Sequence, residues 1–221
     1  MSALMQNYSV RKIRKDDLPE IVRIHSKSFS DRALIKLGKE AVRRYYVFLL
    51  DEFPLSEPIC ATNQERLVGF CFAGIYSGSF SGYIRKNLLF LLGQVLIRPW
   101  LLFSQLFRDL GAPVLHVLKK IVRRRKGKKP SKTQLHTNND SVSINKWGVL
   151  AIAVDPAYQR QGIGDLLMGS VEEHALKLGI DYLDLSVHPE NTPAVRFYEK
   201  LGWEKVQTSA HWDGKMMKRL I

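Results

Sequence analysis

The stretch Val154-Asp-Pro-Ala-Tyr-Gln-Arg-Gln-Gly-Ile-Gly-Asp-Leu-Leu-Met168 decides how the rest of the sequence is interpreted. It follows the continuous apolar segment 149–154, which predicts a strand covered on both faces. After a polar turn that contains two glycines, apolar residues recur at helical spacing until Gly179, which predicts a helix. A tight turn followed by a helix start directs several backbone N–H groups at one point, and the helix dipole adds partial positive charge there. The stretch therefore predicts an anion site suited to a pyrophosphate.

The spacing of this turn differs from two other phosphate-binding motifs. No Gly-Lys-Ser/Thr follows it, so it is not a Walker A loop, and the three-glycine fingerprint of dinucleotide-binding folds is incomplete. Gly162 and Gly164 allow a phosphate to approach the backbone because no Cβ stands in the way. Taken alone, the turn indicates only a ligand that carries phosphate groups.

Two motifs together give the sequence a family resemblance. Gln159-Arg-Gln-Gly-Ile-Gly164 resembles the Gln/Arg-x-x-Gly-x-Gly/Ala acetyl-CoA signature of the GNAT acyltransferase superfamily. Asn191-Thr-Pro-Ala-Val-Arg-Phe-Tyr-Glu-Lys-Leu-Gly-Trp203 is similar to the downstream segment of that family, in which an Asn precedes a helix ending in Phe-Tyr-x-x-x-Gly-Phe/Trp. The resemblance covers residues 8–75 in element order and 149 to about 208 in motif. It implies an α/β fold: a mixed, mostly antiparallel sheet with a splayed central strand pair, flanked by helices.

The resemblance also implies roles for particular residues. Ala153 and Val154 would offer backbone hydrogen bonds to the pantetheine arm, and Asn191 would contact the cofactor arm. Tyr198 would lie near the thioester sulfur and protonate the departing thiolate; the alternative is that its ring only packs the helix on the sheet. The backbone amides expected to hold the pyrophosphate are those of Gln159, Arg160, Gln161, Gly162, Ile163 and Gly164.

The general base is less well defined by the sequence. Relatives that acetylate protein N-termini carry a glutamate on the fifth strand, where this chain has Ser186. Strand alternation puts Asp184, Ser186 and His188 on one side, so either His188 or Asp184 could relay a proton through water. Alternatively, Asp184 bonds a neighbouring amide and His188 caps the strand. The other histidines show no metal-ligand spacing, and no metal is expected.

The resemblance therefore implies an acetyl-CoA-dependent N-acetyltransferase. No Cys lies in either motif, so acetyl is expected to pass directly to a primary amine rather than through an acyl-enzyme. We interpret the acceptor as a small amine, such as an amino sugar or metabolite. Two alternatives stay open: a protein N-terminal or lysine acetyltransferase, and a CoA-binding module associated with membrane or nucleic acid that has no turnover.

A basic segment interrupts an otherwise near-neutral chain. Of the net charge of +13, the residues from Arg85 to Lys132 carry +12, with thirteen basic side chains and one acid. We expect a single domain over 1–221 with a helical insertion at about 76–146. The insertion is read either as a lid that packs on its own domain or as an interfacial segment that contacts an anionic membrane through Leu88–Lys132. A transmembrane span is disfavoured by Arg98-Pro99, and nucleic-acid binding ranks last because no base-reading module accompanies the charge.

The remaining sequence is that of an ordinary globular chain of 221 residues, 45% hydrophobic and 25% charged. Two cysteines cannot form a disulfide framework, and no signal peptide is recognised, so we expect a cytoplasmic protein. If the insertion binds lipid, the protein is expected to be peripheral at the inner face of a membrane. One helix is expected over 34–49 and another over 192–201, capped by Thr192. A hairpin is expected over 59–75 and a terminal strand pair over 203–221.

Overall fold

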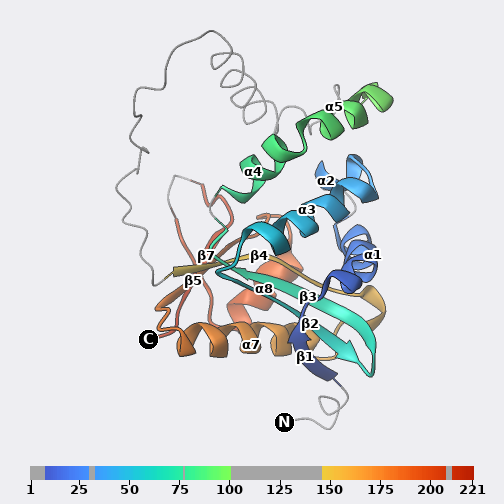
Figure 1. The fold of residues 1–221 in the computed structure, drawn as a ribbon. Helices are drawn as coiled ribbons and strands as arrows, with labels where there is room; N and C mark the ends of the chain where they lie inside the picture. The colour runs from blue at the N-terminus through green and yellow to red at the C-terminus, as the bar shows by residue number, and fades with distance from the viewer. Residues whose placement is uncertain (1–7, 30–32, 77, 101–145, 208–210) are drawn as a thin grey trace. The chain divides into compact units, whose positions relative to one another are not determined.

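The computed structural model describes residues 8–29, 33–76, 78–100, 146–207 and 211–221. These residues form two compact units (Figure 1). The first contains the described residues of 1–28, 50–76 and 142–221, and the second those of 29–49 and 77–141. Three separate stretches of chain thus build the first unit, which holds both sequence motifs.

The first unit is built on a seven-stranded sheet with the order β1-β2-β3-β4-β5-β7-β6. Among the described strands, only β4 and β5 run parallel, and each other pair of neighbouring strands is antiparallel. This confirms the predicted mixed, mostly antiparallel sheet. The strands are β1 (Tyr8–Lys12), β2 (Ser56–Asn63), β3 (Arg66–Gly74), β4 (Lys146–Val154), β5 (Tyr182–Ser186), β6 (Glu204–Lys205) and β7 (Lys215–Arg219).

Helices cover the sheet because its central strands are apolar on both faces. All of β3 after Arg66 is buried. Its Cys71 and Ala73 join the apolar core formed with α7 (Ile163–Lys177) and α8 (Thr192–Lys200), whereas Phe70 and Phe72 pack edge to face outside this cluster. Helix α1 (Leu18–Ser28) also contacts β3 and β4. Figure 1 shows α7 and α8 lying along the sheet.

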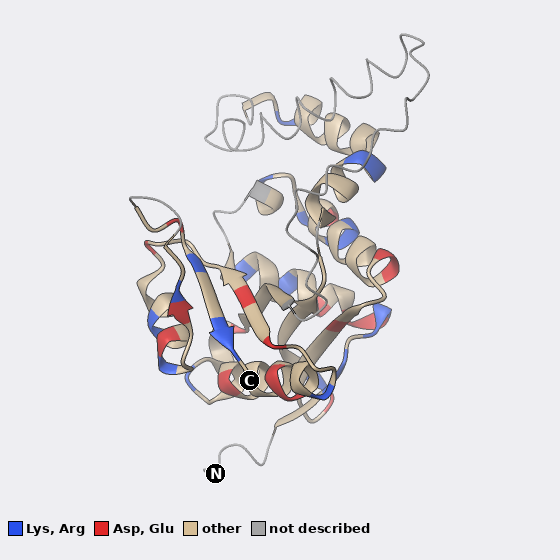
Figure 2. Cartoon of the chain, turned by 90° about the vertical axis from the view of Figure 1, so that its left-hand side faces the viewer, with Lys and Arg blue, Asp and Glu red and all other residues tan. Residues whose placement is uncertain are grey.

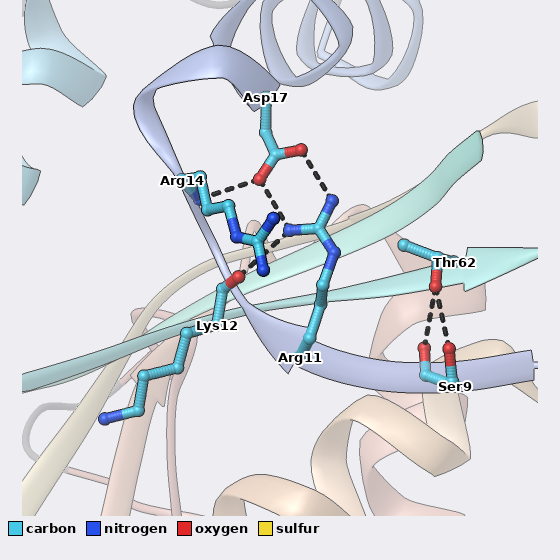
Figure 3. Close-up of polar contacts among 6 residues, drawn as sticks. All are labelled: Ser9, Arg11, Lys12, Arg14, Asp17 and Thr62. Atoms are coloured by element: carbon cyan, nitrogen blue, oxygen red, sulfur yellow. Dashed lines mark hydrogen bonds and ion pairs between the residues drawn. The ribbon is translucent and has the colours of Figure 1, made fainter. Parts of the chain in front are cut away.

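An acidic side chain fixes the corner between β1 and α1. Two hydrogen bonds of 2.7 Å join the Arg11 guanidinium to the Asp17 carboxylate, which also accepts the backbone N–H of Arg14 (Figure 3). The hydrogen bond from Arg11 is the main reason that the pKa of Asp17 lies below its ordinary value. The corner sets the start of α1, which carries residues important to the candidate site.

Two local predictions were wrong in detail. The helix expected over 34–49 is divided into α2 (Ala33–Lys36) and α3 (Lys39–Glu52), because Gly38 adopts a left-handed conformation with φ +100°. The cap of α8 is Asn191 rather than Thr192: the Asn191 side chain accepts a hydrogen bond from the backbone N–H of Ala194. The predicted hairpin and terminal strand pair are present, and α7 ends just before Gly179, which has φ +70°.

The second unit is a cluster of helices that includes α4 (Ser79–Lys86) and α5 (Leu88–Ile97). Tyr83 of α4 is 1% exposed and donates a hydrogen bond of 2.9 Å to the carbonyl of Ala41 in α3. The described part of the predicted insertion is therefore helical, and residues 101–145 lie outside the described residues. No helix in the described ranges has both the length and the apolar character needed to cross a membrane.

Candidate active site

The parallel strands β4 and β5 separate halfway along β4. Lys146–Val149 pair with Tyr182–Leu185, whereas β4 continues to Val154 paired only with β3. The β3–β4 register shifts at the same point: Phe72 lies opposite Ala151 and Ala73 opposite Val149, so Leu150 is an extra residue on β4. Such a bulge bends a strand. From Leu150 onward, the edge of β4 that faces β5 has no partner in the described sheet.

The backbone groups on this open edge follow from strand alternation. The N–H of Asp155 donates to the Val68 carbonyl of β3 at 2.8 Å, so the polar groups of Asp155 face β3. Those of Ala153 then also face β3, while those of Ile152 and Val154 face the open edge. The expected backbone contact from Ala153 to the pantetheine arm does not agree with this direction, and Ile152 takes its place. The Val154 carbonyl accepts a hydrogen bond of 3.3 Å from the Gln159 side chain, in agreement with that direction.

The turn after β4 requires two residues with positive φ. Arg160 has φ +61° and Gly162 has φ +81°, directly before α7 begins at Ile163. Among the described residues no side chain caps α7 at Gly162, and the first backbone N–H groups of a helix have no intrahelical acceptor. The α7 start is thus a set of hydrogen-bond donors at the positive end of a 15-residue helix.

Gly164 has a packing role that sequence reasoning did not assign. A Cβ at this position would lie 3.0 Å from Cζ of Phe197 in α8. The two helices therefore approach closely at their junction, which brings the α7 start and the α8 aromatic residues together.

A buried carboxylate anchors the beginning of the turn. Asp155 is 1% exposed, and its Oδ2 lies 2.7 Å from the Arg23 guanidinium of α1. Its Oδ1 lies 3.9 Å from Nζ of Lys27 and accepts the backbone N–H of Ala157. Burial alone would raise the pKa of the Asp155 carboxyl, but the hydrogen bonds from Arg23 and Ala157 and the two cationic charges outweigh it and hold that pKa below its ordinary value.

A second tether reaches the turn from β1. The Tyr8 hydroxyl donates a hydrogen bond to Oε1 of Gln161. Neither tether was found from the sequence, because each joins residues that are distant along the chain and belong to no shared motif. The one local signal was the Asp155-Pro156 pair, which is typical of a capped turn.

Tyr198 lies on the buried side of α8. It is 8% exposed, and its ring packs against Phe197 and Trp203 at centroid distances of 5.2 and 5.9 Å. Burial, and to a lesser degree the neighbouring Cys71, raises the pKa of the Tyr198 phenol well above its ordinary value of 10.0. The phenol is therefore protonated throughout the neutral range and able to donate a proton.

The residues weighed as proton acceptors follow the expected alternation along and beyond β5. Leu185 and Val187 are buried, Asp184 is half-buried, and Ser186 and His188 are exposed. Nδ1 of His188 accepts the backbone N–H of Glu190 at 3.4 Å. Within the described ranges, no three His, Cys, Asp or Glu side chains are arranged to hold a metal ion.

Comparison with known proteins is consistent with this geometry. Residues 131–203 match the model of the acetyltransferase (GNAT) family. A 64-residue segment is 43% identical to the [ribosomal protein bS18]-alanine N-acetyltransferase of Escherichia coli, covering 29% of this chain and 43% of that protein. A 69-residue segment is 38% identical to an uncharacterized N-acetyltransferase of Methanocaldococcus jannaschii, covering 31% and 30% of the two chains. The chain thus spans less than half the length of these curated relatives.

Solved structures share the fold over nearly the whole chain. The crystal structure of the Escherichia coli ribosomal-protein-S18-alanine N-acetyltransferase superposes with a TM-score of 0.54 at 15% identity, covering 96% of this chain and 94% of that one. That of the PaiA N-acetyltransferase from Thermoplasma acidophilum, in complex with coenzyme A, gives 0.54 at 17% identity and covers 99% of both chains. The chain has the fold of the GNAT N-acetyltransferases. Residues 131–203 of this fold are the part that matches the model of the acetyltransferase (GNAT) family.

Proposed function

We propose that the protein is an N-acetyltransferase that moves acetyl from acetyl-CoA to a primary amine. The observation that carries this proposal is the open edge of β4, which runs directly into the uncapped start of α7. A pantetheine arm needs hydrogen-bonding groups along an extended path, and a pyrophosphate needs convergent N–H donors. The residues present fit both requirements.

In this proposal Ile152 and Val154 bind the pantetheine arm through their backbone, with Ala153 between them. The amides of Gln159, Arg160, Gln161, Gly162, Ile163 and Gly164 hold the pyrophosphate, and Asn191 contacts the arm while capping α8. Tyr198, whose phenol holds its proton throughout the neutral range, donates that proton to the leaving thiolate. His188 accepts the proton of the attacking amine through water, since its exposed ring is reachable by solvent.

For the acceptor we propose a small amine, on the ground that Ser186 stands where N-terminal acetyltransferases are expected to carry glutamate. The second candidate is a protein N-terminus, because relatives include the bS18-alanine N-acetyltransferase and the catalytic subunit of the N-terminal acetyltransferase B complex of Arabidopsis thaliana. The family match at 131–203 includes the α7 start as well as Ser186, and it does not include β1–β3.

We further propose that residues 1–221 form one catalytic domain that works at an anionic membrane surface. The segment 77–145 lies between β3 and β4, which are neighbouring strands, so it is inserted into a continuous sheet. Its cationic and apolar composition supports a membrane surface as the place of action.

Thermal unfolding and thiol release test the acetyltransferase proposal together. At acetyl-CoA concentrations about a hundredfold above Kd, the Tm is expected to rise by about 5–10 °C. Thiol should be released only when an amine is added, and a panel of amino sugars, polyamines and N-terminal peptides identifies the acceptor class. A Tm shift without amine-dependent release would favour a CoA-binding module, and no shift would contradict the proposal.

Gly162→Ala is expected to weaken acetyl-CoA binding by about tenfold, because a methyl group at this turn obstructs the approach of a phosphate to the backbone. Gly202→Ala is the matched control, since Gly202 has the same φ of +81° but follows α8. Both variants should lose similar stability through backbone strain, so a difference in Kd measured by calorimetry reports the turn itself. Equal Kd values would contradict a phosphate site at this turn.

A further inference from the structure

Helix α5 is apolar around nearly its whole circumference, with Gln94 as its one polar side chain, and has no buried residue. Leu89 is 85% exposed, Leu96 80% and Leu92 42%, and their spacing puts all three on one face of the helix. Ile97 and Trp100 are 67% and 64% exposed. Helices that are apolar all round are usually enclosed by protein or lipid, so this exposure needs a partner.

The charged residues in the chain segment that contains α4 and α5 are all positive. Between 78 and 100 the sequence contains Arg85, Lys86 and Arg98 and no acidic residue, so in Figure 2 neither α4 nor α5 carries red. Arg85 and Lys86 are exposed and are the last two residues of α4, and only Asn87 separates them from α5. Exposed cations beside apolar side chains are complementary to a surface that is both anionic and apolar beneath.

The length of α5 decides between crossing a membrane and lying on it. Ten residues give a helix of about 15 Å, half of the roughly 30 Å of a hydrocarbon core. The opposite part of the helix is also held by protein: Phe90 lies under the Arg44 guanidinium of α3, 4.1 Å from its ring centroid. One face of α5 is thus fixed to its own unit, and the leucine face is presented outward.

We infer that the α5 leucine face, Leu89, Leu92 and Leu96, inserts into the interface of an anionic lipid bilayer, with Arg85 and Lys86 on the headgroups. This inference rests on the membrane association proposed above and names the residues that produce it. Trp100 fits the same place, because an indole ring is suited to the boundary between headgroups and acyl chains. The acyltransferase chemistry does not depend on these side chains.

Vesicle sedimentation of the full chain tests the inference. We expect binding to vesicles of equal parts phosphatidylcholine and phosphatidylglycerol, and far weaker binding to phosphatidylcholine alone. The double variant Leu89→Ser/Leu96→Ser should lower the partition coefficient by about tenfold or more. Arg85→Gln/Lys86→Gln should lower it by about fivefold for each cation removed.

The matched control is Leu176→Ser/Leu178→Ser, which removes two exposed leucines, 45% and 56% accessible, at the end of α7. It should bind vesicles like the wild type. Unchanged binding by Leu89→Ser/Leu96→Ser would overturn the role of α5, and absence of wild-type binding would overturn the membrane association as well. Acetyl-CoA-dependent Tm shifts on the same samples without vesicles test the acetyltransferase separately.

Two further outcomes would assign the leucine face to another partner. If Leu89→Ser/Leu96→Ser lowers Tm well below that of the control variant, α5 is covered by its own chain and the inference is wrong. If the wild type sediments as a dimer without lipid and this variant as a monomer, the partner is a second copy of the chain. An unchanged Tm and a monomer in both proteins support the lipid interface.

Discussion

Tyr198→Phe is expected to lower kcat by about a hundredfold, with KM for acetyl-CoA nearly unchanged. The substitution removes only the hydroxyl and retains the ring packing against Phe197 and Trp203. If the phenol protonates the departing thiolate, its loss affects a step after both substrates have bound. Steady-state thiol release with the acceptor found in the amine panel measures both constants.

The control for this variant is Tyr182→Phe, which removes the same atom from a half-buried tyrosine on β5. It should leave kcat within about twofold of the wild type. Equal kcat for Tyr198→Phe and the wild type would mean that Tyr198 only packs α8 on the sheet. A parallel fall of kcat and Tm in Tyr198→Phe would likewise indicate a structural role.

The pH profile of the wild type provides an independent check on Tyr198. Burial raises the pKa of its phenol, so the proton is held from acid pH to beyond the ordinary value of 10.0. The proton donor is therefore not expected to produce any loss of kcat between neutral pH and pH 10. An alkaline loss of kcat below that value that disappears in Tyr198→Phe would show that Tyr198 is the proton donor but that its pKa is not raised, whereas a loss that persists in Tyr198→Phe would belong to another group.

Features that depend on neighbouring residues were predicted well from the sequence. The strand 149–154, the turn after it and the helix ended by Gly179 follow from short-range patterns, and the structure has all three. The error at 34–49 shows the limit of periodicity: apolar spacing continued through Gly38, while the backbone turned left-handed there. At 191–192 two good capping residues are adjacent, and spacing could not choose between them.

Features that depend on distant residues could not be predicted from one sequence. The point where β4 leaves β5 is set by the extra residue at Leu150, which is defined only by the register with β3. The contacts that hold the turn likewise cannot be predicted without the fold, because Tyr8 and Gln161, which are hydrogen-bonded, lie 153 positions apart in the chain. The sequence therefore located the donor groups of the candidate site but not the contacts that hold them.

Asp155→Asn is expected to destabilise the protein by about 2–3 kcal/mol at neutral pH, because it leaves Arg23 facing a buried neutral amide. Acetyl-CoA affinity should also fall, since the turn from Pro156 to Gly162 begins at this anchor. Urea unfolding measures the free energy, and calorimetry measures Kd.

Glu20→Gln is the matched control for the anchor. It makes the same carboxylate-to-amide change against the same guanidinium, but the Glu20 side chain is 40% exposed. Such an exposed pair is worth less than about 1 kcal/mol. Equal losses in the two variants would contradict the assignment of Asp155 as a buried anchor of the turn.

The pH dependence of the Asp155→Asn effect follows from the sign of the pKa shift. A carboxyl whose pKa is lower in the folded state contributes stability at pH values above its unfolded pKa, and this contribution is lost as pH falls through the folded value. The difference in unfolding free energy between wild type and Asp155→Asn should therefore shrink as the pH is lowered past the ordinary carboxyl value of 3.8. If the difference in unfolding free energy stays constant at acid pH, the stability lost in Asp155→Asn comes from packing of the turn. It would then not come from the Asp155 charge that Arg23 and Lys27 of α1 neutralise.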